Sequence, residues 1–207
     1  MSKINFFNEP KAYKEQISHY FPDTIPVTFD HLKEHFNITI FGMDIPLLKK
    51  IDNLDELHDL DDIAGIALID ENNINLIYNN NVSIDVKEQR FALATLIGYC
   101  ENLKGEKERP SVCKRFSSMQ KCDDAQDNIS REEFQEYVNN NCARQILMPQ
   151  KWFEMHYDAL SKTCSFEDIV ERLSELYVVP KRQVEIRCKE LGYIVSIDSK
   201  SKINIKK

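Results

Sequence analysis

The amino-acid sequence predicts an α+β fold, in which a small antiparallel sheet packs against helices and the C-terminal part is helical. Two apolar, β-branched runs joined by a polar turn, Ile63 to Asp70 and Ile74 to Tyr78, have the pattern of a β-hairpin. From Val86 onward, apolar residues instead recur at helical spacing. Hydrophobic residues make up 42% of the 207 residues, which is enough for a sizeable core.

Further elements are expected before this hairpin. A helix is predicted to end near Phe21-Pro22, and Asp30 is the expected N-cap of a short helix from His31 to Phe36. Asn37 to Gly42 is alternating and β-branched, so a strand is expected there. The acidic residues 51–62 are expected to form a solvated surface.

Three helices are expected after the hairpin. The first, Val86 to Leu103, carries an apolar stripe, and the second, Arg131 to about Leu147, follows a capping box of Ser130 and Glu133. The third is Gln150 to Leu160. Residues 104–129 are polar and poor in aliphatic side chains, so a long mobile surface loop is expected there. The stripe of the first helix consists of Val86, Leu93, Leu96, Ile97, Cys100 and Leu103.

Residues 161–207 have the outline of a helix-turn-helix followed by a small hairpin. Ser165 and Asp168 cap one helix, and a second helix from Lys181 to Leu191 ends at Gly192. We therefore expect a winged-helix-like module that follows a main domain at residues 1–160. Eight Lys or Arg against three Asp or Glu in residues 181–207 keep DNA binding open as an alternative. The side chains expected to make such contacts are Lys181, Arg182, Lys200 and Lys202.

Two of the predicted helices carry patterns that resemble those of a known family. The first matches the frame of a metallopeptidase helix at Arg90, Phe91, Leu93, Ala94 and Gly98. The second matches at Glu136, Asn140, Ala143 and then Leu147-Met148-Pro149. With both motifs in this order and register, the chain resembles the ImmA/IrrE family of small zinc metallopeptidases, which cut or release helix-turn-helix repressors. The resemblance covers roughly residues 25–195 and implies a minimal zincin-like fold.

The chain departs from this family at the residues that carry the chemistry. The family reads His-Glu-x-x-His on the first helix and supplies a third ligand, a carboxylate, from the second. Here the corresponding positions are Thr95, Leu96, Tyr99 and Glu136. Thr and neutral Tyr are poor zinc ligands, and Leu cannot act as a general base. The resemblance therefore implies a pseudo-protease with no catalytic residues, metal or cofactor.

One other pattern keeps an active enzyme open as an alternative. His31-Leu32-Lys33-Glu34-His35 is a literal His-x-x-Glu-His, the inverted zincin motif, in which His31 and His35 would bind the metal and Glu34 would be the base. Because no third ligand is indicated, a surface helix is the favoured interpretation. The six Cys residues contain no C-x-x-C pair and are expected to be reduced.

Composition narrows the remaining function classes. The net charge of −7 argues against nucleic-acid binding by the whole chain. The first twenty residues contain no apolar run typical of a secretory signal, and no apolar run approaches the roughly 18 residues of a membrane span. We therefore expect a cytoplasmic, non-catalytic regulator. Its expected partner, as the resemblance implies, is a helix-turn-helix transcription regulator of a phage or mobile element.

Overall fold

The computed structural model describes residues 22–44, 63–69, 73–80, 85–103, 112–117, 131–197 and 203–205, in places by the backbone alone. This described part contains six helices and six strands. In chain order they are α2 (Phe29–Phe36), β1 (Thr39–Met43), β2 (Ile63–Ile69), β3 (Ile74–Asn79), α4 (Val86–Leu103), β4 (Val112–Ser117), α5 (Arg131–Leu147), α6 (Gln150–Leu160), α7 (Phe166–Tyr177), α8 (Lys181–Glu190), β5 (Ile194–Ile197) and β6 (Ile203–Ile205). The helix predicted before Pro22, the acidic residues 51–62 and the cap at Ser130 lie outside it.

The α+β class is confirmed, and the main sheet has four strands in the order β1-β3-β2-β4. The predicted hairpin is present as the antiparallel pair β2–β3, and β4 pairs antiparallel with β2. The sheet is not purely antiparallel as expected, because β1 runs parallel to β3. Because β2 is antiparallel to β3, β2 itself returns the chain to the start of β3, which allows β1 and β3 to be parallel.

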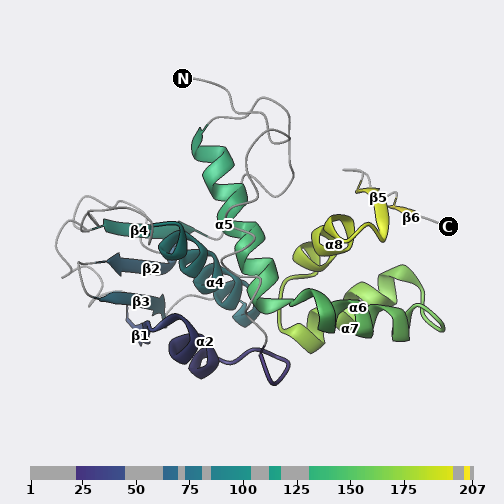
Figure 1. Cartoon of the computed structure of the whole chain (residues 1–207), viewed down its shortest axis with the longest axis horizontal. Coiled ribbons are helices and arrows are strands. Elements are labelled where there is room, and N and C mark those ends of the chain that lie inside the picture. Colours follow the sequence, from purple (N-terminus) through teal and green to yellow (C-terminus); the bar gives the residue numbers. More distant parts are fainter. Residues whose placement is uncertain are drawn as a thin grey trace.

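Helices cover one face of this sheet. In Figure 1, α4 crosses the sheet, α5 runs steeply past α4, and α2 lies beside β1. The helices α6, α7 and α8 lie at the opposite end of the molecule, with the β5–β6 hairpin next to α8. A single hydrophobic cluster extends from Val27 to Cys188, so residues on both sides of the expected boundary at residue 160 share it.

The expectation of a continuous surface loop at residues 104–129 is wrong for Val112–Ser117. These residues form β4, an edge strand that pairs with β2 from Ile69↔Val112 to Ile63↔Ser117. The sequence Val-Cys-Lys-Arg-Phe-Ser contains too few aliphatic residues to indicate a buried strand. Its strand conformation therefore depends on pairing with β2, and not on local preference.

The start of α2 also differs from the prediction. The N-cap is Thr28 and not Asp30, because the Thr28 hydroxyl accepts a hydrogen bond from the His31 backbone N–H at 3.2 Å. In return, Nδ1 of His31 accepts from the Thr28 backbone N–H at 3.4 Å, which completes a capping box. Asp30 lies in the first turn and forms an ion pair with Lys33 at 3.1 Å.

The bounds of α4 and α5 are as predicted, and the two helices pack closely. Among the stripe residues whose burial the structure describes, Val86 is the exception, since it is 55% exposed at the first turn of α4. Gly98 faces α5: a Cβ built there would lie 2.7 Å from the Cβ of Cys142. A close contact between helix and sheet occurs at Gly65 of β2.

The C-terminal elements occur in the predicted order. Ser165 caps α7 by accepting from the Asp168 N–H, and α7 ends at Val178, which adopts the left-handed conformation. Leu176, in the last turn of this helix, is 36% exposed. After α8, Gly192 has a φ of 79°, and the Tyr193 N–H donates to the Cys188 carbonyl at 2.9 Å. The β5–β6 hairpin follows, as the winged-helix outline predicts.

Candidate functional site

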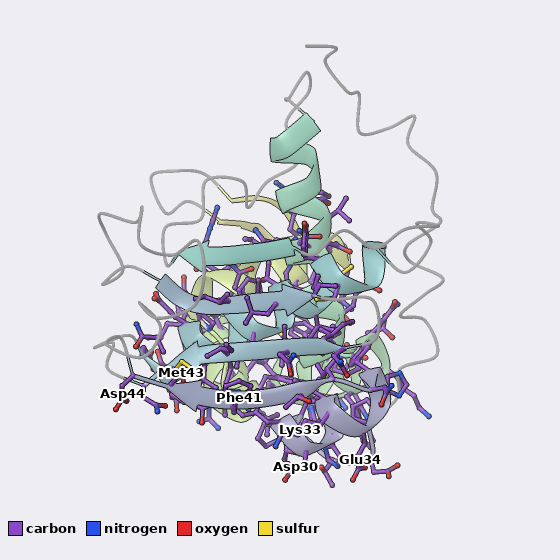
Figure 2. The ribbon with its side chains drawn as sticks, turned by 90° about the vertical axis from the view of Figure 1, so that its left-hand side faces the viewer. Asp30, Lys33, Glu34, Phe41, Met43 and Asp44 are labelled. Atoms are coloured by element: carbon purple, nitrogen blue, oxygen red, sulfur yellow. The ribbon has the colours of Figure 1, made fainter. Side chains whose placement is uncertain are left out.

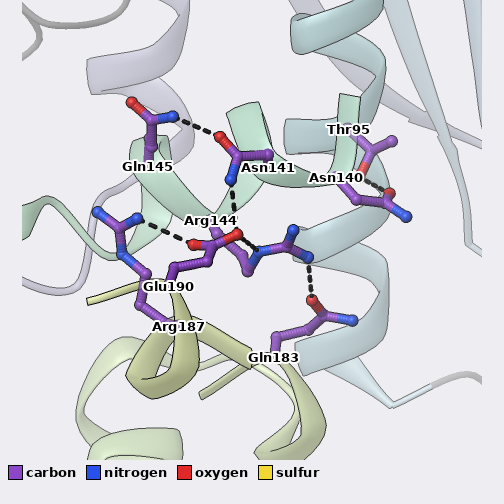
Figure 3. A network of polar contacts seen from close by, with 8 residues as sticks. All are labelled: Thr95, Asn140, Asn141, Arg144, Gln145, Gln183, Arg187 and Glu190. Atoms are coloured by element: carbon purple, nitrogen blue, oxygen red, sulfur yellow. Dashed lines mark hydrogen bonds and ion pairs between the residues drawn. The ribbon is translucent and has the colours of Figure 1, made fainter. Parts of the chain in front are cut away.

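The four positions that the resemblance assigns to zinc chemistry lie on α4 and α5. Thr95, the first ligand position, is only 5% exposed. Its hydroxyl lies 3.0 Å from the Phe91 carbonyl oxygen and 3.3 Å from Oδ1 of Asn140 on α5 (Figure 3). Because a hydroxyl has one hydrogen, it donates to one of these oxygens at a time. Thr95 therefore serves to bridge the two helices within the core.

Leu96, at the position of the general base, faces the sheet. It is 1% exposed, and its Cδ1 lies 3.2 Å from where a Cβ on Gly65 of β2 would be. Cδ2 of Leu93 on α4 lies 3.6 Å from the same Cβ position. A Cβ at residue 65 would therefore crowd Leu96, and the absence of a side chain there lets α4 lie close on the sheet.

The other two positions are less enclosed or less fully described. Tyr99 is partly buried and packs against the hydrophobic cluster. Glu136 lies on α5, one helical turn before Asn140, and the structure describes its backbone only. Asn140 is fully buried and contacts Thr95, so this α5 side chain reaches the first ligand position. The sequence indicated Asn140 only as a match to the family pattern.

The two histidines of the alternative motif on α2 make contacts within that helix and its N-cap. His31 takes part in the capping box, and the His35 ring packs edge-on against Phe36 with ring centroids 4.8 Å apart. Glu34 is exposed. Among the side chains that the structure describes, no three His, Cys, Asp or Glu lie close enough together to hold a metal ion. No described side chain therefore supplies a third metal ligand beside His31 and His35, with Glu34 as the base.

A buried polar network that the sequence did not reveal joins α5 to α8 (Figure 3). At its centre is Glu190, whose Oε1 accepts from Nε of Arg144 at 2.8 Å and from Nδ2 of Asn141 at 2.6 Å. Its Oε2 accepts from Nη1 of Arg187 at 3.0 Å. Nη1 of Arg144 donates to Gln183 at 3.0 Å. Arg144 has no exposed surface, so the network fixes α8 on α5 through an ion pair inside the protein.

This network changes the expected charge of the C-terminal helix surface. Glu190 turns toward α5, and Arg187, which pairs with it, is buried. Lys181 and Arg182, which were expected to contact DNA, are exposed at the start of α8. Lys181 forms an ion pair with Glu171 of α7, and Arg182 pairs with Glu185 at 3.4 Å. The other two predicted contacts, Lys200 and Lys202, lie outside the described residues.

Arg90, part of the family frame, holds three segments together. Its Nη2 donates to the Val27 carbonyl at 2.6 Å and its Nε to the Val178 carbonyl at 3.2 Å. Its guanidinium carbon lies 5.8 Å from the centre of the Phe29 ring. The residue that introduces the motif helix is thus a structural contact between α4, the entry to α2 and the turn after α7.

Three of the four cysteines whose side chains are described are buried. They are Cys100, Cys142 and Cys188, whereas Cys164 is partly exposed. Burial raises the pKa of the Cys188 thiol to about 12, so it stays protonated near neutral pH. Cys113 and Cys122 lie outside the described side chains.

Comparisons with known proteins add no assignment to this geometry. No protein-family model matches the chain, and no curated protein matches it in sequence. No helix in the part of the chain that the structure describes is both long enough and apolar enough to span a membrane.

Proposed function

We propose that this protein is a non-catalytic regulator, derived from the ImmA/IrrE type of zinc metallopeptidase, that acts by binding a protein partner. By analogy with that family, the partner is a helix-turn-helix transcription regulator of a phage or mobile element, encountered in the cytoplasm. The protein would control this partner by occupancy, without cleaving it.

The packing of Thr95 and Leu96 is the observation that supports this proposal best. A zinc peptidase needs two imidazoles on one helix face and a carboxylate that can take a proton from the attacking water. Here the first ligand position is a hydroxyl held in the core, and the base position is an aliphatic side chain packed on β2. Both side chains contribute to stability where the family would place polar, reactive groups.

The alternatives have less support from the described side chains. An enzyme using His31, Glu34 and His35 would have to give up the capping role of His31. A DNA-binding role through α8 would have to displace the carboxylates that pair with Lys181 and Arg182. Neither alternative is favoured by a specific contact.

The family frame can be tested by restoring the ligands. If the frame is correct, the variant Thr95→His/Tyr99→His places two imidazoles one turn apart, close to Glu136 on the next helix. We expect it to bind about one zinc ion per chain, measured by metal analysis after purification without chelator. Adding Glu136→Ala to this variant is the matched control and should remove the zinc. A restored variant that stays free of zinc while remaining folded would contradict the proposed ancestry.

The loss of catalysis is tested on the unmodified chain. We expect it to contain well below one zinc per chain, and a candidate helix-turn-helix partner to remain intact after incubation. Stoichiometric zinc that disappears in His31→Ala/His35→Ala would instead establish the enzyme alternative.

A further inference from the structure

No further strand pairs with the outer edge of β1 in the described part of the protein, and α2 lies beside this strand (Figure 1). β1 is the last strand of its sheet and pairs only with β3. The Met43 carbonyl accepts from the Asn80 N–H at 3.1 Å, so Met43 and, by alternation along the strand, Phe41 direct their backbone groups toward β3. Ile40 and Gly42 consequently direct their N–H and C=O groups away from the sheet, where another strand could pair with them.

This edge lacks two of the sequence features by which proteins usually prevent strand addition. Its sequence, Thr-Ile-Phe-Gly-Met, contains no charged residue and no proline. The strand at the opposite edge, β4, contains Lys114 and Arg115. In addition, Phe41 in the middle of β1 is 38% exposed, and Met43 is partly exposed two residues further on. The edge thus offers unpaired backbone groups together with exposed apolar side chains.

The surroundings of the edge are acidic. Figure 2 shows Asp30 and Glu34 on α2 and Asp44 at the end of β1 on the same side of the molecule as Phe41 and Met43. All three carboxylates are on exposed residues, and the one labelled cation among them, Lys33, already pairs with Asp30. A second copy of this chain, with its net charge of −7, would bring the same carboxylates to the interface. Charge complementarity therefore favours a different, basic partner.

From these observations we infer that the outer edge of β1 is the docking site for an extended segment of a partner protein that carries Lys or Arg. The segment would add to the sheet as a further strand, with its backbone bonded to Ile40 and Gly42 and its cations near Glu34 and Asp44. The inference rests on the partner-binding part of the proposed function and supplies the surface for it.

A synthetic nine-residue peptide of alternating Lys and Val is a suitable probe, with the full chain as receptor. We expect binding at peptide concentrations of about 1 mM or below, weakening as salt is added. Hydrogen exchange measured by NMR should slow at the amides of Ile40 and Gly42 more than at Phe41, whose N–H is already turned toward β3. The same peptide methylated on its backbone nitrogens, and one of alternating Glu and Val, should bind at least tenfold more weakly.

Charge reversal tests the acidic surroundings. Glu34→Lys/Asp44→Lys should weaken binding of the Lys-Val peptide at least tenfold without changing the melting temperature. The matched control is Asp23→Lys/Asp158→Lys, which reverses two other exposed carboxylates. It changes the net charge of the chain by the same amount, and the affinity for the peptide should stay within about twofold of that of the unmodified chain.

Three outcomes would overturn the inference. The first is no binding, and the second is binding that protects amides elsewhere in the chain. The third is protection of Ile40 and Gly42 by self-association without peptide, which would identify a second copy as the occupant. None of these results bears on zinc binding by the restored variant, so the two proposals can fail separately.

Discussion

Replacing Glu190 by Gln should destabilise the protein far more than an ordinary loss of one ion pair. Glu190 accepts from two guanidinium groups, those of Arg144 and Arg187, and both arginines are at least 95% buried. Gln keeps the shape but removes the negative charge and directs an NH₂ group toward these donors. Two cations would then lie inside the protein without a counter-charge from Glu190.

The magnitude follows from this uncompensated charge. Breaking a buried ion pair by removing one partner costs about 3–5 kcal/mol. The remaining bond of Arg144 to Gln183 does not neutralise it. For a chain of this size, each kcal/mol lowers the melting temperature by about 2–4 °C, so Glu190→Gln should melt about 6–20 °C lower. Urea denaturation followed by circular dichroism gives the free energy of unfolding directly.

A matched control shows whether the loss of stability comes from the burial of the ion pair or from the loss of any ion pair. Glu171→Gln removes the carboxylate of an exposed pair with Lys181 and should cost no more than about 1 kcal/mol. A variant in which Arg144, Arg187 and Glu190 are all Met should recover most of the stability, because no buried charge is left. The reasoning would be refuted if Glu190→Gln and Glu171→Gln had equal effects.

Three further substitutions test other contacts. Thr28→Ala should cost about 1 kcal/mol in urea denaturation through loss of the α2 cap, and an equal effect of Thr24→Ala would contradict this. Gly98→Ala should destabilise by about 1–3 kcal/mol because its Cβ would lie 2.7 Å from that of Cys142; a more stable variant would show that α4 and α5 are not so close. Burial lowers the pKa of His156 below 6.5, so the unfolded chain takes up the proton first, and stability is lost as the pH falls through 6.5. Relative to His156→Gln, the unmodified chain should lose stability between pH 7 and 5, by at most about 1.4 kcal/mol per pH unit; parallel curves would contradict this.

The elements that sequence predicted best are those with a local signal. The periodicity of α4 and the Ser165 cap of α7 depend on residues within a few positions of one another. At α2 the expected cap, Asp30, was wrong, and the N-cap is Thr28 because its hydroxyl reaches the His31 N–H. Such choices depend on backbone geometry at a single turn, which composition does not specify.

The features that sequence missed depend on partners far along the chain. The sequence of β4 is typical of a loop, and these residues form a strand because they pair with β2. The direction of β1 likewise depends on its pairing with β3. Arg144 and Glu190 are 46 residues apart, and nothing near either of them indicates an ion pair. At the candidate site, the sequence identified Thr95 and Leu96 as departures from the family, but their burial and contacts required the structure.

The hydrophobic cluster that extends from Val27 to Cys188 has a consequence for how such a chain can evolve. A segment can be exchanged between proteins as a cassette when its buried surface belongs to it alone. Leu173 and Val184 share their cluster with Leu32 and Phe91, so moving residues 161–207 into another protein would leave apolar surface uncovered on both pieces. In this lineage, new binding preferences are therefore expected to arise by point substitution on exposed surfaces such as the outer edge of β1, and not by recombination of its C-terminal segment.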